Sequence, residues 1–472
     1  MFEKSFLKEV LERALSNGGD FSDIFVEEKR STGISCEAER IERVQTGTDI
    51  GAGIRVVSGD STAYAYTNDL SRKGLLEVAE IVSHAARGDK KEINLDLRRV
   101  KPLVEFSFKE RPEEVPTERK TSLVEAADRS ARAVDKERVK QVIVAYGDVV
   151  QKVTIANSEG DYVEDERIRT RLVVQAVAAS GTSIQTGFEA VGSLSGFELF
   201  EKYLPDKVAE TAAARAVQML EARPAPSGKM PVVLAGEAGG TMVHEACGHG
   251  LEADLVQKGL SVYTGKKGEK VASEEVSVID DATIDRRYGS YGIDDEGVPS
   301  RKVSLIEKGV LTDFLYDRLT AGKDGRKSNG HGRRESYQHK PVPRMGNTYI
   351  APGKTDPEKI IRETKNGLLV KKMGGGQVNT ATGDFVFDVA EGYVIEEGEI
   401  GPMVRGATLT GNGPEVLRIV DAVGSDLGFT IGTCGKDGQG VPVSDAQPTL
   451  AVRRLIVGGT AYGSTNGRIR RI

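Results

Sequence analysis

The stretch Arg223-Pro224-Ala225-Pro226 divides the chain into two parts with different sequence patterns. Before it, apolar residues recur at helical spacing from about Leu204 to Ala222. After it, glycines become frequent and strand-like runs dominate, the first of them from Met230 to Leu234. Proline fixes its own backbone and lacks an N–H donor, so two prolines in four residues interrupt both kinds of element. We therefore expect a domain boundary here, followed by a large β-rich domain over residues 228–472.

Upstream of this boundary, the pattern predicts two smaller units that mix helices and strands. Residues 1–95 begin and end with amphipathic helical patterns around strand-like runs, and residues 117–223 show the same mixture with longer strands. The charged segment 96–116 between them contains three prolines and has the composition of a linker. We therefore expect an α+β protein, with two N-terminal units that are each an antiparallel sheet covered by helices, followed by the β-rich domain at 228–472.

The composition is that of a globular protein with balanced charge. Of 472 residues, 65 are Lys or Arg and 71 are Asp or Glu, and the two kinds are interspersed. This distribution gives no basic surface for nucleic acid. No apolar stretch approaches the roughly 18 residues that a membrane-spanning helix needs. We therefore expect no nucleic-acid partner and no membrane partner.

The cysteines and the start of the chain indicate the compartment. The three cysteines, Cys36, Cys247 and Cys434, are too few and too scattered for a disulfide framework. The first residues lack the apolar run of a secretory signal. Both features are typical of a protein in a reducing compartment, so we expect a cytoplasmic location.

The segment with the most chemistry is His244-Glu245-Ala246-Cys247-Gly248-His249-Gly250. Two of the five histidines in the chain flank a glutamate here, within the one strong helical pattern of the β-rich domain, at about 237–254. Imidazoles bind Zn²⁺, and a neighbouring carboxylate can act as a general base toward metal-bound water. The alternative is a helix surface that merely contains these residues. Because so few histidines are available, their clustering favours a metal site.

The spacing of the two histidines predicts an irregular helix. In the common metallopeptidase helix the histidines are four residues apart, whereas His244 and His249 are five apart. On a regular α-helix this places the two rings roughly 140° apart, too far around the helix to share one ion. A π-type turn adds the residue that brings them together, and Gly248 and Gly250 make a departure from regular geometry easy. We therefore predict an irregular or π-type turn between His244 and His249.

Two histidines alone do not make a catalytic zinc site, which usually has three protein ligands and one open position. On the residues alone, the third ligand remains open among six candidates: Cys247, Cys434, Glu252, Asp254, His331 and His339. Cys434 stands between glycines with Lys436 nearby, which favours an exposed loop thiolate. Cys247 lies between the histidines on a different helical face, where a buried thiol is the ordinary expectation.

Further segments along nearly the whole chain carry a family resemblance. They are Gly53-Ile54-Arg55-Val56, Ala63-Tyr64-Ala65-Tyr66-Thr67, Ile155-Ala156-Asn157-Ser158-Glu159-Gly160, Asp294-Asp295-Glu296-Gly297, Arg344-Met345-Gly346-Asn347-Thr348, Gly383-Asp384-Phe385 and Cys434-Gly435-Lys436-Asp437-Gly438-Gln439. Together with the H-E-x-x-x-H run from His244 to His249, they resemble the TldD branch of the TldD/PmbA (TldD/TldE) family. The partner branch, TldE/PmbA, characteristically lacks that run.

The resemblance implies a zinc metallopeptidase of the α+β class. It implies that His244, His249 and Cys434 hold the metal and that Glu245 is the general base. Family members act on unfolded or extended polypeptides, often as dimers, so the resemblance implies a peptide substrate and a dimer with itself or with a TldE/PmbA-like subunit. An edge strand of the β-rich domain could bind such a peptide by strand addition. One departure from the family is Ser444-Asp445-Ala446-Gln447, which stands where we expect a glycine-containing turn.

Two other function classes stay open at this point. One is a non-catalytic peptide-binding or chaperone-like module with structural or absent zinc, although structural zinc normally has four protein ligands. The other is a cysteine hydrolase that uses Cys247 with His244 or His249, which requires a hydrogen bond between thiol and imidazole.

Two charged clusters have weaker meaning. Asp294-Asp295-Glu296 could bind a second cation, but an acidic turn is the simpler expectation. A basic cluster could bind the carboxylate of a peptide end or of an acidic side chain, although a solvated loop is the simpler expectation there too. Its members are Arg326, Lys327, His331, Arg333 and Arg334.

Overall fold

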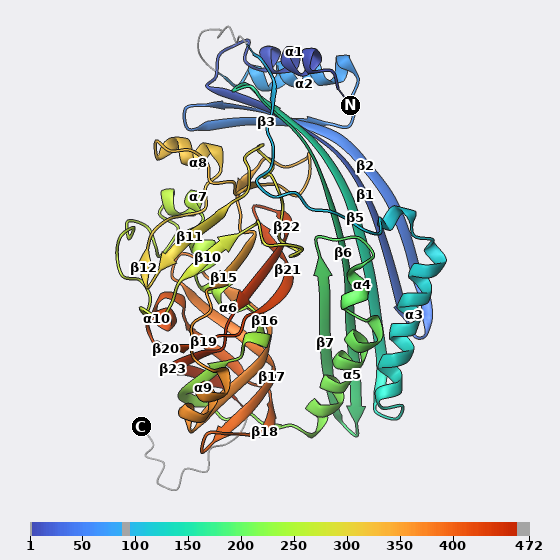
Figure 1. Cartoon of the computed structure of the whole chain (residues 1–472), viewed down its shortest axis with the longest axis vertical. Helices are drawn as coiled ribbons and strands as arrows, with labels where there is room; N and C mark the ends of the chain where they lie inside the picture. The colour runs from blue at the N-terminus through green and yellow to red at the C-terminus, as the bar shows by residue number, and fades with distance from the viewer. Residues whose placement is uncertain (1, 87–94, 460–472) are drawn as a thin grey trace.

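The computed structural model describes residues 2–86 and 95–459. The first half of the chain forms one long curved sheet with helices, and the second half forms a β-rich body beside it (Figure 1). The predicted α+β class is confirmed. No helix among these residues is both long enough and apolar enough to cross a membrane.

The first half of the chain contains seven strands and six helical segments among the described residues. Its strands are β1 (Phe21–Glu37), β2 (Arg40–Ser58), β3 (Ser61–Thr67), β4 (Arg98–Arg99), β5 (Val139–Asn157), β6 (Asp161–Ser180) and β7 (Ser183–Ser193). Its helices are α1 (Lys4–Ala14), α2 (Arg72–Ser83), η1 (Pro112–Glu114), α3 (Thr117–Val134), α4 (Leu199–Lys202) and α5 (Pro205–Glu221).

The second half is rich in strands and has only short helical segments. Its strands are β8 (Arg223–Pro224), β9 (Gly228–Leu234), β10 (Val278–Asp281), β11 (Lys302–Glu307), β12 (Val310–Leu311), β13 (Gly332–Arg333), β14 (Val342–Pro343), β15 (Asn347–Ile350), β16 (Gly367–Val378), β17 (Asp384–Glu396), β18 (Glu399–Arg405), β19 (Thr408–Asn412), β20 (Val420–Val423), β21 (Gly428–Lys436), β22 (Gln439–Gln447) and β23 (Leu450–Gly458). Its helical segments are η2 (Gly236–Ala238), α6 (Thr241–Val243), η3 (His244–Gly248), η4 (His249–Leu251), α7 (Ala253–Gln257), α8 (Arg318–Lys323), α9 (Pro357–Thr364) and α10 (Gly413–Arg418).

The two predicted N-terminal units share one sheet, whereas the sequence predicted a separate sheet for each. The strand order is β3-β2-β1-β5-β6-β4, with β7 also paired to β6. Strand β1 pairs antiparallel with β5 from Asp23 opposite Asn157 to Glu37 opposite Ile143, and this pairing joins the units. A period-two pattern shows which side of a strand is apolar but not which strand lies beside it, so this pairing was not visible in the sequence.

The two faces of this long sheet have different neighbours. Helices α1 and α2 cover one end of one face, where they pack on Ile24, and helices α3 and α5 cover the other end, where they pack on Val144. Alternate side chains such as Phe25 point to the opposite face and contact Ile293 and Tyr337 of the C-terminal body. The alternation therefore assigns one sheet face to the helices and the other to the C-terminal body.

The C-terminal body contains two large sheets. One has the strand order β12-β11-β10-β15-β22-β21, and the other has the order β16-β9-β23-β19-β17-β18-β8, with β20 paired to β23. A single apolar core joins residues of both sheets with Val243, Ala246 and Cys247. The predicted regular helix at 237–254 is instead a series of short turns, so the histidine segment packs among strands of both sheets.

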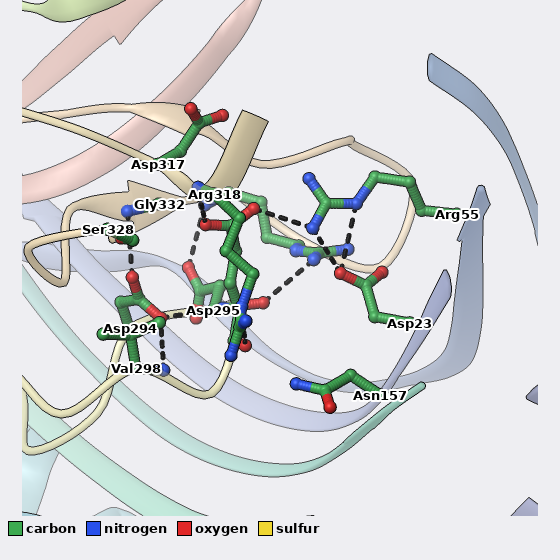
Figure 2. A network of polar contacts seen from close by, with 12 residues as sticks. Asp23, Arg55, Asn157, Asp294, Asp295, Val298, Asp317, Arg318, Ser328 and Gly332 are labelled. Atoms are coloured by element: carbon green, nitrogen blue, oxygen red, sulfur yellow. Dashed lines mark hydrogen bonds and ion pairs between the residues drawn. The ribbon is translucent and has the colours of Figure 1, made fainter. Parts of the chain in front are cut away.

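Buried ion pairs join the long sheet to the C-terminal body. Arg55 of β2 is fully buried, and its guanidinium donates to Asp23 of β1 and lies 2.7 Å from a carboxylate oxygen of Glu296 (Figure 2). Arg318 of α8 reaches back toward the same side of the sheet, with its Nη2 2.8 Å from Asp161. Each half of the chain therefore supplies an arginine that pairs with a carboxylate of the other half.

The acidic segment at the same joint is a turn, as the sequence predicted, and it is buried. Asp294, Asp295 and Glu296 are all buried. Asp294 accepts the backbone N–H groups of Glu296 and Val298, and Asp295 lies 2.6 Å from Arg167. The segment is a turn, but its charges are satisfied by arginines and backbone donors rather than by water.

Removing the Arg55 guanidinium should weaken the joint strongly. Arg55→Met leaves the carboxylates of Asp23 and Glu296 buried without their partner, so we expect a loss of about 3–5 kcal/mol in the free energy of unfolding. Arg72→Met is the matched control, because the Arg72 side chain is 66% exposed in its ion pair with Glu9; its cost should stay below about 1 kcal/mol. Urea unfolding followed by circular dichroism measures both, and equal midpoints for the two variants would contradict the importance of the buried pair.

Candidate metal centre

The segment from His244 to His249 contains the predicted π-type turn. The backbone N–H of His249 bonds to the carbonyl of His244, five residues earlier, and η3 spans His244–Gly248. This widened turn brings the two imidazoles together, with ring centroids 5.1 Å apart and ring planes at 87°. The prediction of an irregular turn is confirmed, and the five-residue spacing is its cause.

The two glycines of this segment serve close packing rather than backbone freedom. Gly248 has ordinary helical dihedral angles, with φ of −53°. A Cβ atom on Gly248 would lie 2.2 Å from the sulfur of Met345, and one on Gly250 would lie 2.9 Å from the ring of Tyr263. Any larger residue would therefore push the histidine turn away from the strands behind it.

Cys434 comes from β21, not from the exposed loop that the sequence predicted. It lies in an antiparallel hairpin with β22, opposite Val441, and is only 4% exposed. The hairpin turns at Asp437 and Gly438, whose φ angles of +56° and +73° are typical of a tight two-residue turn. The glycine-rich run is therefore a hairpin that holds the cysteine at a fixed position.

His244, His249 and Cys434 form one cluster in which the candidate ligand atoms all lie within 4.8 Å of one another. The sulfur of Cys434 lies 3.4 Å from Nε2 of His249. Two ligand atoms around a tetrahedral zinc ion with ordinary bond lengths are about 3.5 Å apart. In addition, Nδ1 of His244 is buried without a hydrogen-bond partner in the protein. Two imidazoles and one thiolate are donors that zinc prefers, so these residues fit a zinc ion.

The two histidines favour the thiolate form of Cys434. Although burial opposes ionisation, hydrogen bonds and positive charge from His244 and His249 lower the pKa of the Cys434 thiol to about 5. Cys247 shows the opposite behaviour, because burial raises the pKa of its thiol to about 12. Only one of the two cysteines near the histidines is therefore prepared to bind a cation.

A buried chain of charged groups contacts Nδ1 of His249. Oε2 of Glu252 lies 3.1 Å from Nδ1 of His249, on the side of the ring away from Cys434. Lys436 lies 3.0 Å from Glu252 and 2.6 Å from Asp254. Despite full burial, the charges of Lys436 and His249 lower the pKa of Glu252 to about 2. Glu252 and Asp254 therefore orient the centre and are not part of the ligand cluster, a role that no separate signal in the sequence indicated.

The remaining candidates for the third ligand lie elsewhere. Nε2 of His331 is 3.1 Å from Asp280 in a fully buried pair, and His339 contacts Ser336. The thiol of Cys247 donates to the backbone carbonyl of Val243, at 3.1 Å. The thiol–imidazole hydrogen bond that a Cys247 hydrolase would need is therefore absent, since this thiol is used by the backbone.

Glu245 and the ligand cluster line the same cavity, which we call the metal cavity and which has a volume of about 840 Å³. Glu245 is half-buried there, so its carboxylate has access to the space beside the cluster. Strands β21 and β16 form much of the wall, including Gly374 and Gly375, which belong to β16 rather than to a flexible loop. A carboxylate, a cluster of candidate metal ligands and extended backbone therefore face one space.

Asp445 is a cavity residue that sequence reasoning missed. Residues 444–447, where this sequence lacks the glycine-containing turn that the resemblance leads us to expect, continue strand β22. Asp445 is buried in the wall of the metal cavity, where it accepts a hydrogen bond from Thr430 at 3.2 Å. Burial raises the pKa of its carboxyl, against the lowering effect of His244. Asp445 is opposite Thr430 in the β21–β22 ladder. A prediction of this hairpin and its register could therefore have placed Asp445 beside the residues around Cys434.

The different thiol pKa values predict selective chemical modification. In chelator-treated protein at about pH 6, iodoacetamide should modify Cys434 at least about tenfold faster than Cys247, because only the thiolate is nucleophilic. Mass spectrometry of the digested protein measures the rate at each cysteine. Comparable rates at the two thiols, or protection of Cys434 at this pH, would contradict the ionised cluster.

Comparison with known proteins identifies the family. Residues 22–86, 110–220 and 227–459 match the models of domain 1, the central domain and the C-terminal domain of the PmbA/TldA metallopeptidases. A metalloprotease of Methanothermobacter thermautotrophicus is 38% identical over 93% of this chain and 96% of its own. A metalloprotease TldD homologue of Haemophilus influenzae is 37% identical over 93% of each chain.

A solved structure adds a likeness of fold. The crystal structure of TldE from Thermococcus kodakarensis superposes with a TM-score of 0.75 over 96% of this chain and 100% of that chain, at 20% sequence identity. The family models cover all but short segments between 22 and 459, and relatives above 30% identity match nearly end to end. The chain therefore belongs to the PmbA/TldD family of metallopeptidases.

Proposed function

We propose that this protein is a zinc-dependent peptidase that hydrolyses peptide bonds in unfolded or extended polypeptides. The observation that carries the proposal is the convergence of His244, His249 and Cys434 within 4.8 Å on a cavity that Glu245 also lines. Three protein ligands leave a fourth position for water or substrate, which is typical of catalytic rather than structural zinc. The names of the relatives as metalloproteases support the same reading.

The roles of the residues follow from their positions. His244, His249 and Cys434 would hold the metal, which when bound supplies a Lewis acid that polarises a carbonyl and makes water acidic. Glu245 takes the proton from the attacking water and transfers it to the leaving amine. Glu252 keeps the ring of His249 oriented, with Lys436 neutralising the buried carboxylate.

The preference for extended chains is supported by β21. This strand is at the end of its sheet, and one of its edges pairs with no other strand of the described chain. Residues 430–436 of β21 line the metal cavity. A peptide that added to this edge would present its backbone beside Cys434, and folded proteins offer no such free strand.

The proposal includes a partner and a location. We infer a dimer, either of two identical chains or with a TldE/PmbA-like subunit; the family resemblance and the likeness to TldE support it. We infer a cytoplasmic location, for which the three unpaired cysteines are the support.

Metal content should depend on Cys434 and not on Cys247. Elemental analysis should find about one zinc ion per chain in the parent and in Cys247→Ala, and much less in Cys434→Ala, because only Cys434 belongs to the three-ligand cluster. Cys247 is the matched control, since it lies in the same segment as the histidines. A parent that binds no metal when zinc is supplied would refute the proposed function.

Replacing Glu245 should separate metal binding from catalysis. Glu245→Gln keeps the size of the side chain but removes the base, so hydrolysis of an unfolded, fluorescently labelled polypeptide should fall by about 100-fold or more while zinc content stays unchanged. Glu237→Gln is the control, because that side chain is 61% exposed and pairs with Lys371. Cleavage by Glu245→Gln at the parent rate would show that another group is the base.

A further inference from the structure

A second cavity lies beside the hairpin that carries Cys434. We call it the arginine cavity; its volume is about 420 Å³. Its floor is the face of the long sheet that meets the C-terminal body, and its roof includes Thr433 and Pro442 of the hairpin. Thr433 and Pro442 are opposite each other in the ladder, next to the pair of Cys434 and Val441. The hairpin therefore borders both the arginine cavity and the metal cavity, and Thr433 lines both.

Strand β6 supplies a row of three arginines to this cavity. Arg167, Arg169 and Arg171 alternate with Ile168 and with other side chains that face the helices, so all three point toward the C-terminal body. Arg333 and Arg334 approach from the opposite wall. Two of the five members of the basic cluster that the sequence predicted to be a solvated loop are therefore buried here, each 4% exposed.

Two of these arginines are buried without a carboxylate partner. Arg169 is 7% exposed and donates only to backbone carbonyls, from Nε to Tyr288 at 2.8 Å and from Nη2 to Ser290 at 2.7 Å. Arg333 likewise donates to backbone carbonyls only, those of Met345 and Pro442. Neither forms an ion pair with a described residue. A buried cation ordinarily lies beside a negative charge, and each of these two guanidiniums lacks one.

The acidic residues that line the cavity do not supply the missing negative charge. Six cationic side chains line it, namely Lys29, Arg167, Arg169, Arg171, Arg333 and Arg334, against three acidic ones. Asp295 pairs with Arg167 at 2.6 Å, and Asp148 pairs with Lys120 at 2.7 Å. The third acid, Glu335, accepts the backbone N–H of Gly440 at 2.6 Å. The acids are therefore already engaged, and the cavity keeps an excess of positive charge.

Three further observations agree with a missing anion. Burial, together with the positive charges of Arg333 and Arg167, lowers the pKa of Arg169 to about 9. Nε of Arg334 is buried without a hydrogen-bond partner. Arg171, at the exposed end of the row, makes no hydrogen bond or ion pair with any residue that the structure describes. The N–H groups of a guanidinium match the spacing of two oxygens in an oxyanion, either a planar carboxylate or a tetrahedral phosphate.

We propose that the arginine cavity binds a small ligand through an oxyanion group, either a carboxylate or a phosphate. Arg169 and Arg333 supply the buried charge, and Arg171 closes the contact from the solvent side. The site is distinct from the metal cavity because Thr433 is the only described residue that lines both, and none of the arginines lines the metal cavity. Its volume exceeds that of a simple ion, so the oxyanion belongs to a small molecule rather than to a lone halide.

Calorimetric titration of the zinc-loaded full chain tests this site with two probes. Inorganic phosphate and N-acetylglycine are titrated separately at constant ionic strength set with chloride, because screening affects every charged surface. The parent should bind at least one of them, and Arg171→Gln should weaken that binding by about tenfold or more, the effect of losing a hydrogen bond to a charged group. Arg171 is exposed and unpartnered, so this variant should fold as the parent does.

The control is Arg129→Gln on the exposed side of α3, which should bind the probe as the parent does. The probe that binds more tightly identifies the oxyanion as a phosphate or a carboxylate. Binding that Arg171→Gln leaves unchanged would place the probe elsewhere, for instance on the metal, and would overturn the proposal. Failure of the parent to bind either probe would overturn it as well, whatever the outcome of the peptidase assays.

Discussion

The candidate metal centre depends on one backbone hydrogen bond, from the N–H of His249 to the carbonyl of His244. This bond spans five residues instead of the usual four. It brings the two imidazoles together, whereas a regular α-helix would keep them apart. Neighbouring side chains pack closely against this turn. Met345 leaves no room for a Cβ at Gly248, and Glu252 contacts the one ring nitrogen of His249 that faces away from Cys434. The widened turn is therefore held by packing and by charge together.

The second half of the centre comes from far along the chain. Cys434 is 185 residues from His249, and its position is fixed by the β21–β22 ladder. The same hairpin places Lys436 beside Glu252, so one strand supplies both the thiolate and the cation that supports the histidine. The cluster can therefore form only when the C-terminal sheets have assembled around the histidine turn.

Features that depend on local geometry could be predicted from the sequence. The π-type turn came from the spacing of His244 and His249 alone, and the α+β class came from the alternation of helical and strand-like patterns. Cys434 could be chosen from six candidates only through family resemblance, because no local pattern reports a contact across 185 residues. The single N-terminal sheet was missed for the same reason, since an alternating strand does not reveal its neighbour. The domain boundaries at 1–95, 117–223 and 228–472 stay predictions.

Burial was the other property that the sequence could not give. Charged residues usually face water, so Arg333 was expected in a solvated loop, and the sequence predicted a turn at Asp294 without showing that it is buried. In the fold they lie where the long sheet meets the C-terminal body, and arginines from both halves meet there. The alternating arginines at 167, 169 and 171 are visible in the sequence, but their meaning depends on which sheet face the second half of the chain covers.

The alternation of the β21–β22 hairpin restricts how this region can change in evolution. Because successive side chains point to opposite faces, Cys434 lines the metal cavity alone, whereas its neighbour Thr433 also borders the arginine cavity. Insertion or deletion of one residue between Cys434 and the turn at Asp437-Gly438 would move the Cys434 side chain to the other face of the hairpin, whereas a change of two residues would keep it on its original face. Length variation in relatives should therefore be rare within this hairpin and, where it occurs, should preserve parity between the glycine-containing turn and the cysteine.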